Sequence, residues 1–182
     1  MNTQTTARLQ ITSSALFLFL LLILQLITPN YTLQNNVISD LGINPYSANL
    51  FNPLLIIAGL TIVLIAILHA NNLRDFIFSI SLLTSGFGFA IAGYYPKNIY
   101  VPHVIGAALA FLAAIFAIFY ACKLASGLYQ RIFALLGTIS LVAVVVFSNY
   151  VTNSIVENLI IIPFLIWNIL FGIHLLKNQN RS

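Results

Sequence analysis

Three ionisable side chains on separate segments of the chain are the best candidates for a chemical site. They are Asp40, His103 and Glu157, and all three fall on the predicted outer side of a membrane. One histidine with two carboxylates can bind a divalent metal and leave coordination positions open. The same groups could instead serve as acid and base in the hydrolysis of a lipid head group. Their spacing follows no motif that fixes the geometry, so both chemistries stay open.

Four polar neighbours would complete a network around these candidates. They are Ser39, Asn52, Lys97 and Ser154. Asn52 lies just inside an apolar segment, where a buried amide needs a hydrogen-bond partner, and a neighbouring helix would supply it.

Two of the three candidates also have structural explanations. Glu157 lies three residues after Ser154, so the pair can form a capping box that opens the last helix. His103 follows Pro102, which suits the first turn of a helix, and a helix N-terminus favours the neutral imidazole. A neutral His103 could donate or accept a hydrogen bond in a functional site, or ligate a metal. Alternatively, it makes only a structural hydrogen bond at the membrane interface.

Asp40 is the candidate that most needs a partner. Residues 32–41 predict a short helix that lies on the membrane, with Gly42 as its stop signal. Asp40 would then occupy the last turn, where its charge meets the negative end of the helix dipole. That placement costs a few tenths to about 1 kcal/mol unless a cation or a hydrogen-bond network offsets it. Lys97 and His103 are the available partners.

Other chemistries are disfavoured by the residues present. His69 and His174 could ligate a haem on the inner side, but the dipole already favours histidine at a helix C-terminus, so haem is disfavoured. A single cysteine, Cys122, excludes an internal disulfide and a cysteine-based metal site. The three histidines divide between the two faces, which argues against a three-histidine zinc hydrolase. Seven basic residues spread along the chain form no nucleic-acid patch.

The elements that must position these residues are membrane-spanning helices. The chain is 60% hydrophobic and 5% charged, whereas a soluble domain carries about 25% charged residues. Roughly 20 apolar residues cross a bilayer as a helix. Six stretches qualify, at about 11–29, 50–70, 76–94, 101–121, 130–149 and 155–176. The sequence therefore predicts an all-α integral membrane protein, a six-helix bundle forming one domain over residues 1–182, with the short interfacial helix in its first outer loop.

The basic residues set the predicted orientation. Those on one side are Arg8, Arg74, Lys123, Arg131, Lys177 and Arg181. Lys97 alone falls on the other side. This bias predicts a cell-membrane protein with both termini in the cytoplasm. Ion pumping is disfavoured, because no acidic or basic residue falls in mid-membrane.

Small residues predict which helices pack together, because they let helix backbones approach. The fourth span carries Gly106, Ala110, Ala113, Ala117 and Ala121, and the third carries Ser81, Ser85, Gly86, Gly88 and Gly93. We expect these two helices to pack closely. The stripe on the fourth span could also contact other membrane subunits.

Several short motifs follow one another along the chain. They are Asn36-Val-Ile-Ser39-Asp40-Leu41-Gly42, Phe51-Asn52-Pro53 with Gly59, Gly93-Tyr-Tyr-Pro96 with His103, and Glu157-Asn-Leu-Ile with Pro163, Trp167 and Gly172. In this order they resemble the domain-of-unknown-function 998 family, multipass membrane proteins of bacteria and archaea. The resemblance covers about residues 12–176 and implies a multi-helix membrane fold without an established activity. Lys97 stands where many relatives are expected to carry an acidic residue. This difference weakens the hypothesis of a dedicated metal site in this chain. Alternatively, the ammonium of Lys97 takes the place of a cation that the relatives bind.

Three functions remain open. We favour an accessory or structural membrane subunit that packs against larger partners in the bilayer. One alternative is an outer-face enzyme that acts on a lipid or lipid-linked substrate through Asp40, His103 and Glu157. The other is a lipid- or quinone-binding protein. No cofactor is assigned, and a divalent metal at the outer face stays open. Convergence of the three side chains around one pocket would favour a site.

Overall fold

Six long α-helices make up most of the chain, as the apolar segments predict. The computed structural model describes residues 3–149 and 153–179, so Arg181 of the basic set lies outside the described residues. The helices are α1 Thr3–Ile27, α2 Ala48–Leu73, α3 Phe76–Tyr94, α4 Tyr100–Ala121, α5 Leu128–Asn149 and α6 Ser154–Gln179. All of them are long and apolar enough to cross a bilayer. The chain is therefore a multi-span, all-helical membrane protein.

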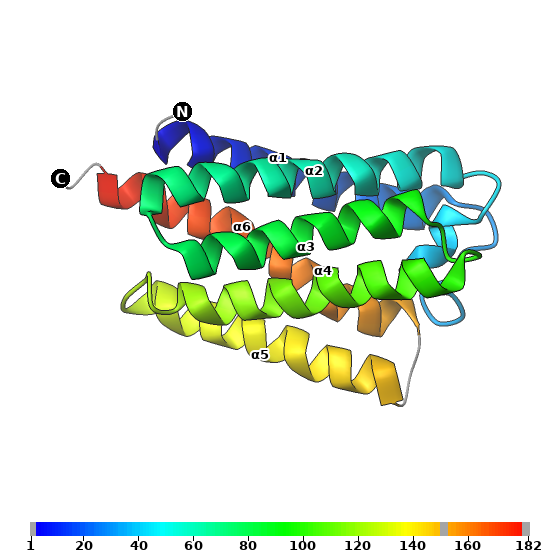
Figure 1. Ribbon diagram of the computed structural model, residues 1–182. Helices are drawn as coiled ribbons and strands as arrows, with labels where there is room; N and C mark the ends of the chain where they lie inside the picture. The colour runs from blue at the N-terminus through cyan, green and yellow to red at the C-terminus, as the bar shows by residue number, and fades with distance from the viewer. Residues whose placement is uncertain (1–2, 150–152, 180–182) are drawn as a thin grey trace.

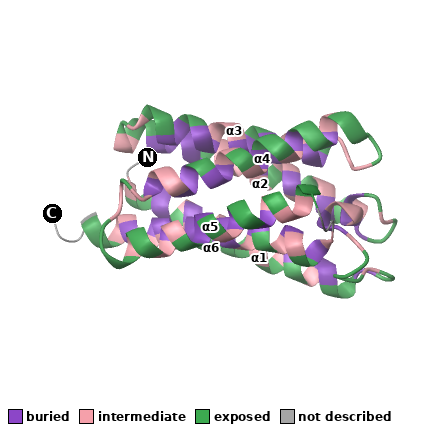
Figure 2. Cartoon of the chain, turned by 90° about the horizontal axis from the view of Figure 1, so that it is seen from below, coloured by how far each residue is buried: buried purple, intermediate pink, exposed green. Residues whose placement is uncertain are grey.

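The helices run side by side in alternating directions (Figure 1). Helices that are neighbours in sequence pack in succession from α1 to α6, and α1 also packs on α6, so the bundle closes. Both chain ends lie at one end of the bundle, and the α1–α2 and α3–α4 connections lie at the other. Following the predicted topology, we call these the inner and the outer end. The helices carry buried and exposed residues on different faces, as Figure 2 shows, which suits helices surrounded by lipid.

Aromatic side chains fill the centre of the bundle. Trp167 and Phe171 of α6 stack with ring centroids 5.6 Å apart. Phe78 of α3 approaches Phe171 at 5.1 Å, and Phe133 of α5 meets Trp167 edge-on at 6.3 Å. All four side chains are buried. Aromatic pairs at such distances add to the stability that burial provides.

Helices α3 and α4 pack closely, as predicted, because glycine brings their backbones together. A Cβ atom placed on Gly88 of α3 would lie 2.3 Å from the nitrogen of Ala110 and 2.6 Å from the carbonyl oxygen of Gly106. Gly106, Ala110, Ala117 and Ala121 of α4 are all buried. The small-residue stripe is therefore used inside the bundle.

Side-chain amides join the first helix to the last. Gln25 of α1 and Asn158 of α6 exchange two hydrogen bonds, with donor–acceptor distances of 3.1 and 2.8 Å. Nearer the inner end, Gln10 of α1 donates to the Oδ1 atom of Asn168 of α6 at 3.0 Å. Such bonds between helices substitute for water that lipid cannot supply.

The first outer loop corrects the predicted helix over residues 32–41. Only Ile38–Gly42 is helical, as a short 3₁₀ helix, η1. The Asn36 side chain accepts from the backbone N–H of Thr32, and the Thr32 hydroxyl accepts from that of Asn35. Such local bonds compete with a helix. Ile38 and Leu41 are buried in the core of the bundle, so the apolar side of η1 packs against protein.

Candidate functional site

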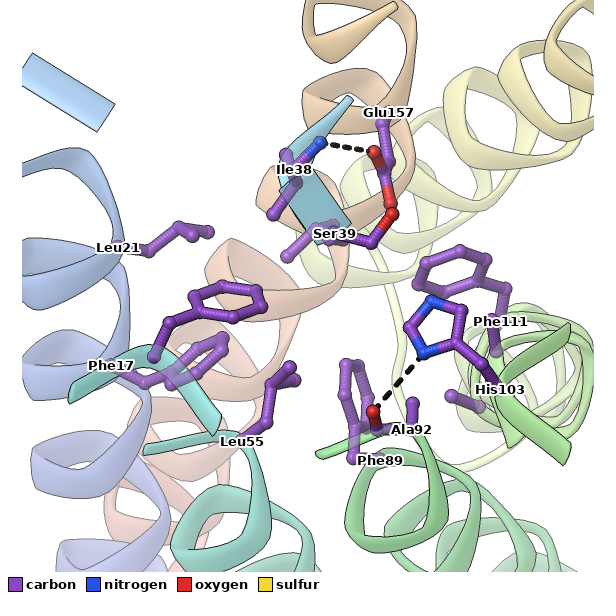
Figure 3. Close-up of a pocket in the computed structure, with 14 residues that line it drawn as sticks. Phe17, Leu21, Ile38, Ser39, Leu55, Phe89, Ala92, His103, Phe111 and Glu157 are labelled. Carbon is purple, nitrogen blue, oxygen red and sulfur yellow. Dashed lines mark hydrogen bonds between the residues drawn. The ribbon is translucent and has the colours of Figure 1, made fainter. Parts of the chain in front are cut away.

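A small cavity lies among the helices near the outer end. Its volume is about 30 Å³, and α1, η1, α2, α3, α4 and α6 all contribute to its wall. The wall is largely apolar, and its ionisable members are His103 and Glu157, with Ser39 beside them. Figure 3 shows these three side chains around the space above the rings of Phe17 and Phe89. We call this the outer cavity.

Glu157 is buried at the start of α6, with 6% of its surface exposed. Its Oε2 atom accepts a hydrogen bond of 2.6 Å from the backbone N–H of Ile38 in η1. The predicted capping box with Ser154 does not form. The Oδ1 atom of Asn153 accepts from the N–H of Val156 instead. Glu157 therefore turns into the bundle and holds the first outer loop.

Ser154 ties the same loop to α6. Its backbone N–H and its hydroxyl both donate to the carbonyl oxygen of Asn36, at 2.6 and 2.9 Å. The Tyr31 hydroxyl also bonds the Ser154 hydroxyl. Burial, together with the negative charges of Glu157 and Asp40, raises the pKa of Tyr31 to about 12, although the bond to Ser154 lowers it. Tyr31 is consequently a neutral phenol at any physiological pH.

His103 lies in the first turn of α4, as predicted, and is 8% exposed. Its Nδ1 atom is 3.1 Å from the carbonyl oxygen of Ala92 and 2.9 Å from that of Tyr95. A carbonyl oxygen can only accept, so Nδ1 carries the proton and donates to the end of α3. In the neutral ring Nε2 is then a lone-pair acceptor. That nitrogen turns toward the side of the cavity where Ser39 and Glu157 lie (Figure 3).

Asp40 has the partner that its charge requires, but it does not line the outer cavity. Its Oδ1 atom is 2.5 Å from the ammonium of Lys97. Its Oδ2 atom accepts from the backbone N–H of Val37 and the amide of Asn36. Partial burial would raise the pKa of Asp40, but the bonds from Lys97, Val37 and Asn36 lower it. The predicted unfavourable dipole contact was wrong, because Asp40 caps the first turn of η1.

The other predicted polar neighbours connect the loop to the bundle. Asn52 of α2 donates from Nδ2 to the carbonyl oxygen of Gly42 at 2.9 Å, so its partner is the end of η1 and not another spanning helix. Ser39 lines the outer cavity. The structure therefore gathers Ser39, His103 and Glu157 around one space, while Asp40 and Lys97 pair beside it.

The arrangement limits the chemistry at this end. Over residues 3–149 and 153–179, no group of three His, Cys, Asp or Glu side chains is placed to hold a metal ion. A carboxylate and the Nε2 lone pair of His103 both accept hydrogen bonds. The outer cavity can therefore receive a group that donates hydrogen bonds.

Sequence reasoning missed a second polar cluster toward the inner end. His69, considered above only as a haem ligand on the inner side, is fully buried, and its Nε2 atom lies 2.8 Å from the Oε1 atom of Gln10. Gln10 in turn reaches Asn168, whose Nδ2 atom donates to the carbonyl oxygen of Phe164. The positions of Gln10 and Asn168 could have predicted this cluster. Both are amides that border or interrupt apolar segments, and buried amides need hydrogen-bond partners. His174 contacts Asn178 and the carbonyl oxygen of Leu124.

Comparison with known protein families places most of the chain in a described family. A family model described as "Protein of unknown function (DUF998)" matches residues 11–174, which is most of the chain. Comparisons with curated proteins and with solved structures gave no match.

Proposed function

The chain belongs to the DUF998 family of proteins of unknown function, and we propose that this member binds a membrane amphiphile by its head group in the outer cavity. The observation that carries the proposal is that a buried carboxyl, Glu157, and the buried His103 imidazole line one cavity, with Ser39, in a largely apolar wall. Ligand sites are commonly apolar, with a few polar groups that fix orientation.

The polar groups select a head group that donates hydrogen bonds. Glu157 as a carboxylate and neutral His103 present acceptors to the cavity. A primary ammonium would donate to both and would also neutralise the buried carboxylate, whose burial is costly when unpaired. A hydroxyl would donate without supplying charge. A carboxylate or phosphate head group would be repelled by Glu157. The expected order of affinity is therefore amine, then alcohol, then acid.

The size of the outer cavity limits what enters it. A volume of about 30 Å³ corresponds to about two or three water molecules, because each needs about 10 to 15 Å³ of such volume. A single amine or hydroxyl fits this space, whereas a sugar or a phosphate ester does not. The rest of the amphiphile must lie beyond it.

The other two functions have less support. The accessory-subunit hypothesis depended on the small-residue stripe of α4, whose residues Gly106, Ala110, Ala117 and Ala121 are buried within the bundle. The enzyme hypothesis needs Asp40 beside His103 and Glu157, but Asp40 pairs with Lys97 outside the cavity lining. An acid–base role for Glu157 and His103 stays a prediction.

We also propose the orientation. Of the basic residues within the described ranges, those at the inner end are Arg8, Arg74, Lys123, Arg131 and Lys177. Lys97 lies at the outer end, paired with Asp40. The positive-inside rule then supports a cell membrane with both termini in the cytoplasm.

Binding of radiolabelled hexadecylamine to the full chain in lipid nanodiscs tests the head-group proposal. Unlabelled hexadecylamine should compete best, hexadecanol less well and hexadecanoate least, because only the first supplies both charge and donors. The Glu157→Gln variant should weaken amine binding at least about ten-fold, which corresponds to about 1.4 kcal/mol.

The matched control is Asp75→Asn, which makes the same change at the inner end, where Asp75 caps α3. It should leave amine affinity as in the wild type. Equal competition by hexadecanoate and hexadecylamine, or an unchanged affinity in Glu157→Gln, would contradict the proposal.

A further inference from the structure

Positive charge at the inner end of the bundle is not neutralised by the residues that the structure describes. Of the three acidic residues in the sequence, Asp75 alone lies at this end, and its carboxylate caps α3. Over residues 3–149 and 153–179 the one ion pair joins Lys97 to Asp40 at the outer end. The basic side chains of the inner end are all exposed, and they belong to Arg8, Arg74, Lys123, Arg131 and Lys177. This end therefore offers cations to a negatively charged partner.

One of these cations is held in place beside the start of α5. The ammonium of Lys177 on α6 lies over the ring of Tyr129, 5.6 Å from its centroid. That ring is itself fixed, because it also packs on His174 of α6, with ring centroids 4.8 Å apart. An aromatic face attracts a cation, so this exposed lysine has a preferred position before any partner arrives. The Tyr129 hydroxyl on the same ring is a hydrogen-bond donor.

A second cation, Arg131, lies on the exposed face of α5. This face carries Leu128, Leu135 and Val142, whose exposed fractions are 70%, 59% and 56%. Residues three, four or seven apart lie on the same side of a helix, and Arg131 stands three residues after Leu128 and four before Leu135. The exposed face of α5 therefore has a cation in its first turn, followed by an apolar surface along the rest of the helix.

This combination matches a phospholipid with a net negative charge. We propose that the start of α5 binds an anionic phospholipid, with Arg131 and Lys177 as cationic contacts and Tyr129 as a hydrogen-bond donor. An arginine side chain binds a phosphate through two parallel hydrogen bonds, and the apolar face of α5 contacts the acyl chains. The proposal does not rest on the amine site, which lies at the opposite end of the bundle and carries the opposite charge.

The head group decides the selectivity, because acyl chains are common to all phospholipids. Phosphatidylcholine carries the same phosphate as phosphatidylglycerol, but its own ammonium group offsets the negative charge. Phosphatidylglycerol should therefore bind more tightly. One lysine or arginine close to an anionic lipid surface strengthens association about five-fold. Added salt should weaken the binding, because it screens exposed charges.

The test is native mass spectrometry of the delipidated full chain in mild detergent, titrated with phosphatidylglycerol or phosphatidylcholine. Arg131→Gln and Lys177→Gln should each raise the dissociation constant for phosphatidylglycerol about five-fold. The matched control is Arg74→Gln, which removes the same charge at the same end of the bundle. Arg74 caps the end of α2, whereas α5 packs on α4 and α6. This control should therefore bind phosphatidylglycerol as the wild type does.

Four results would overturn the proposal. Equal affinity for the two phospholipids would show that charge does not select the lipid. An equal loss in Arg74→Gln, Arg131→Gln and Lys177→Gln would show a general attraction that is not localised at α5. Displacement of the lipid by inorganic phosphate would show a site for free anions. A dimer that does not bind phosphatidylglycerol would show that the exposed face of α5 contacts a second copy of the chain.

Discussion

Gly88 offers the sharpest test of how the bundle holds its outer end together. Replacing Gly88 of α3 by alanine adds one Cβ atom at the contact with α4. That atom would lie 2.3 Å from the Ala110 nitrogen and 2.6 Å from the Gly106 carbonyl oxygen. Ordinary contacts of this kind begin at 3.4 Å, and both neighbours are backbone atoms. The two helices must therefore separate locally by about 1 Å, because a well-packed interior cannot absorb the added atom.

The loss of stability expected for Gly88→Ala can be estimated from the effects of overpacking in other proteins. Overpacking a well-packed interior destabilises by about 1 to 3 kcal/mol, and backbone neighbours place Gly88→Ala toward the upper end. Alanine also favours a helix over glycine by up to about 1 kcal/mol, which partly offsets this. For a chain of this length, 1 kcal/mol shifts the melting temperature by roughly 2 to 4 °C. The variant should consequently melt several degrees below the wild type.

The assay is thermal unfolding of the full chain in mild detergent, followed by Trp167 fluorescence. Gly137→Ala on α5 is the matched control, because the nearest atoms to its added Cβ belong to the side chains of Phe119 and Ile118, at 3.1 to 3.2 Å. A phenylalanine ring can shift, so this variant should melt at or above the wild-type temperature. Both substitutions gain the same helix propensity. The difference between the melting temperatures of the two variants therefore reports the effect of the backbone contact at Gly88.

The consequence should extend to the outer cavity. The end of α3 supplies the Ala92 and Tyr95 carbonyl oxygens that hold the Nδ1 atom of His103. Separation of α3 from α4 would lengthen these hydrogen bonds and leave the His103 ring less firmly positioned. Gly88→Ala should therefore also weaken amine binding. If Gly88→Ala melted no lower than Gly137→Ala, the close packing of α3 on α4 would not be limiting, and the argument from the Cβ distances would be refuted.

Two further predictions concern the loops and the ends of the chain. The pKa of Asp40 lies below its usual 3.8, so its pairing with Lys97 stabilises the fold fully above pH 3.8 and is lost as the pH falls through the lowered value. The difference in melting temperature between wild type and Asp40→Asn should therefore shrink as the solution is acidified below pH 3.8, and a difference that widened would contradict the assignment. A fluorescent protein that matures only in the cytoplasm should be bright when fused to either end of the chain; a dark fusion at either end would refute the proposed orientation.

The spanning helices were predictable because the bilayer imposes simple physical limits. A backbone in lipid must satisfy its own hydrogen bonds, and the thickness of the hydrocarbon core sets the length. The predicted spans 76–94 and 101–121 accordingly agree with α3 Phe76–Tyr94 and α4 Tyr100–Ala121 almost residue for residue. The loop over residues 32–41 obeys no such limit. There the side chains of Thr32 and Asn36 decided the outcome, and apolar periodicity does not register them.

The site was predictable in its membership and only partly in its geometry. Scarcity of charge singled out His103 and Glu157, because an ionisable group near lipid invites explanation. Their orientation depends on partners distant in sequence. Ile38 lies 119 residues from Glu157, so no local motif could reveal that the carboxyl turns inward. The burial of His69 likewise depends on Gln10, 59 residues away.

The bonds between α1 and α6 bear on how the chain is made. Gln25 and Gln10 find their amide partners 133 and 158 residues later in the sequence. During synthesis the Gln25 amide and the Gln10 amide nitrogen therefore lack these partners until the last helix is inserted, whereas the Gln10 oxygen can already bond His69 of α2. Truncated chains would expose those amides to lipid, a mark by which membrane proteases and chaperones can recognise an unfinished protein. Glu157 also lies on α6, so insertion of this helix supplies the partners of the α1 amides and completes the wall of the outer cavity.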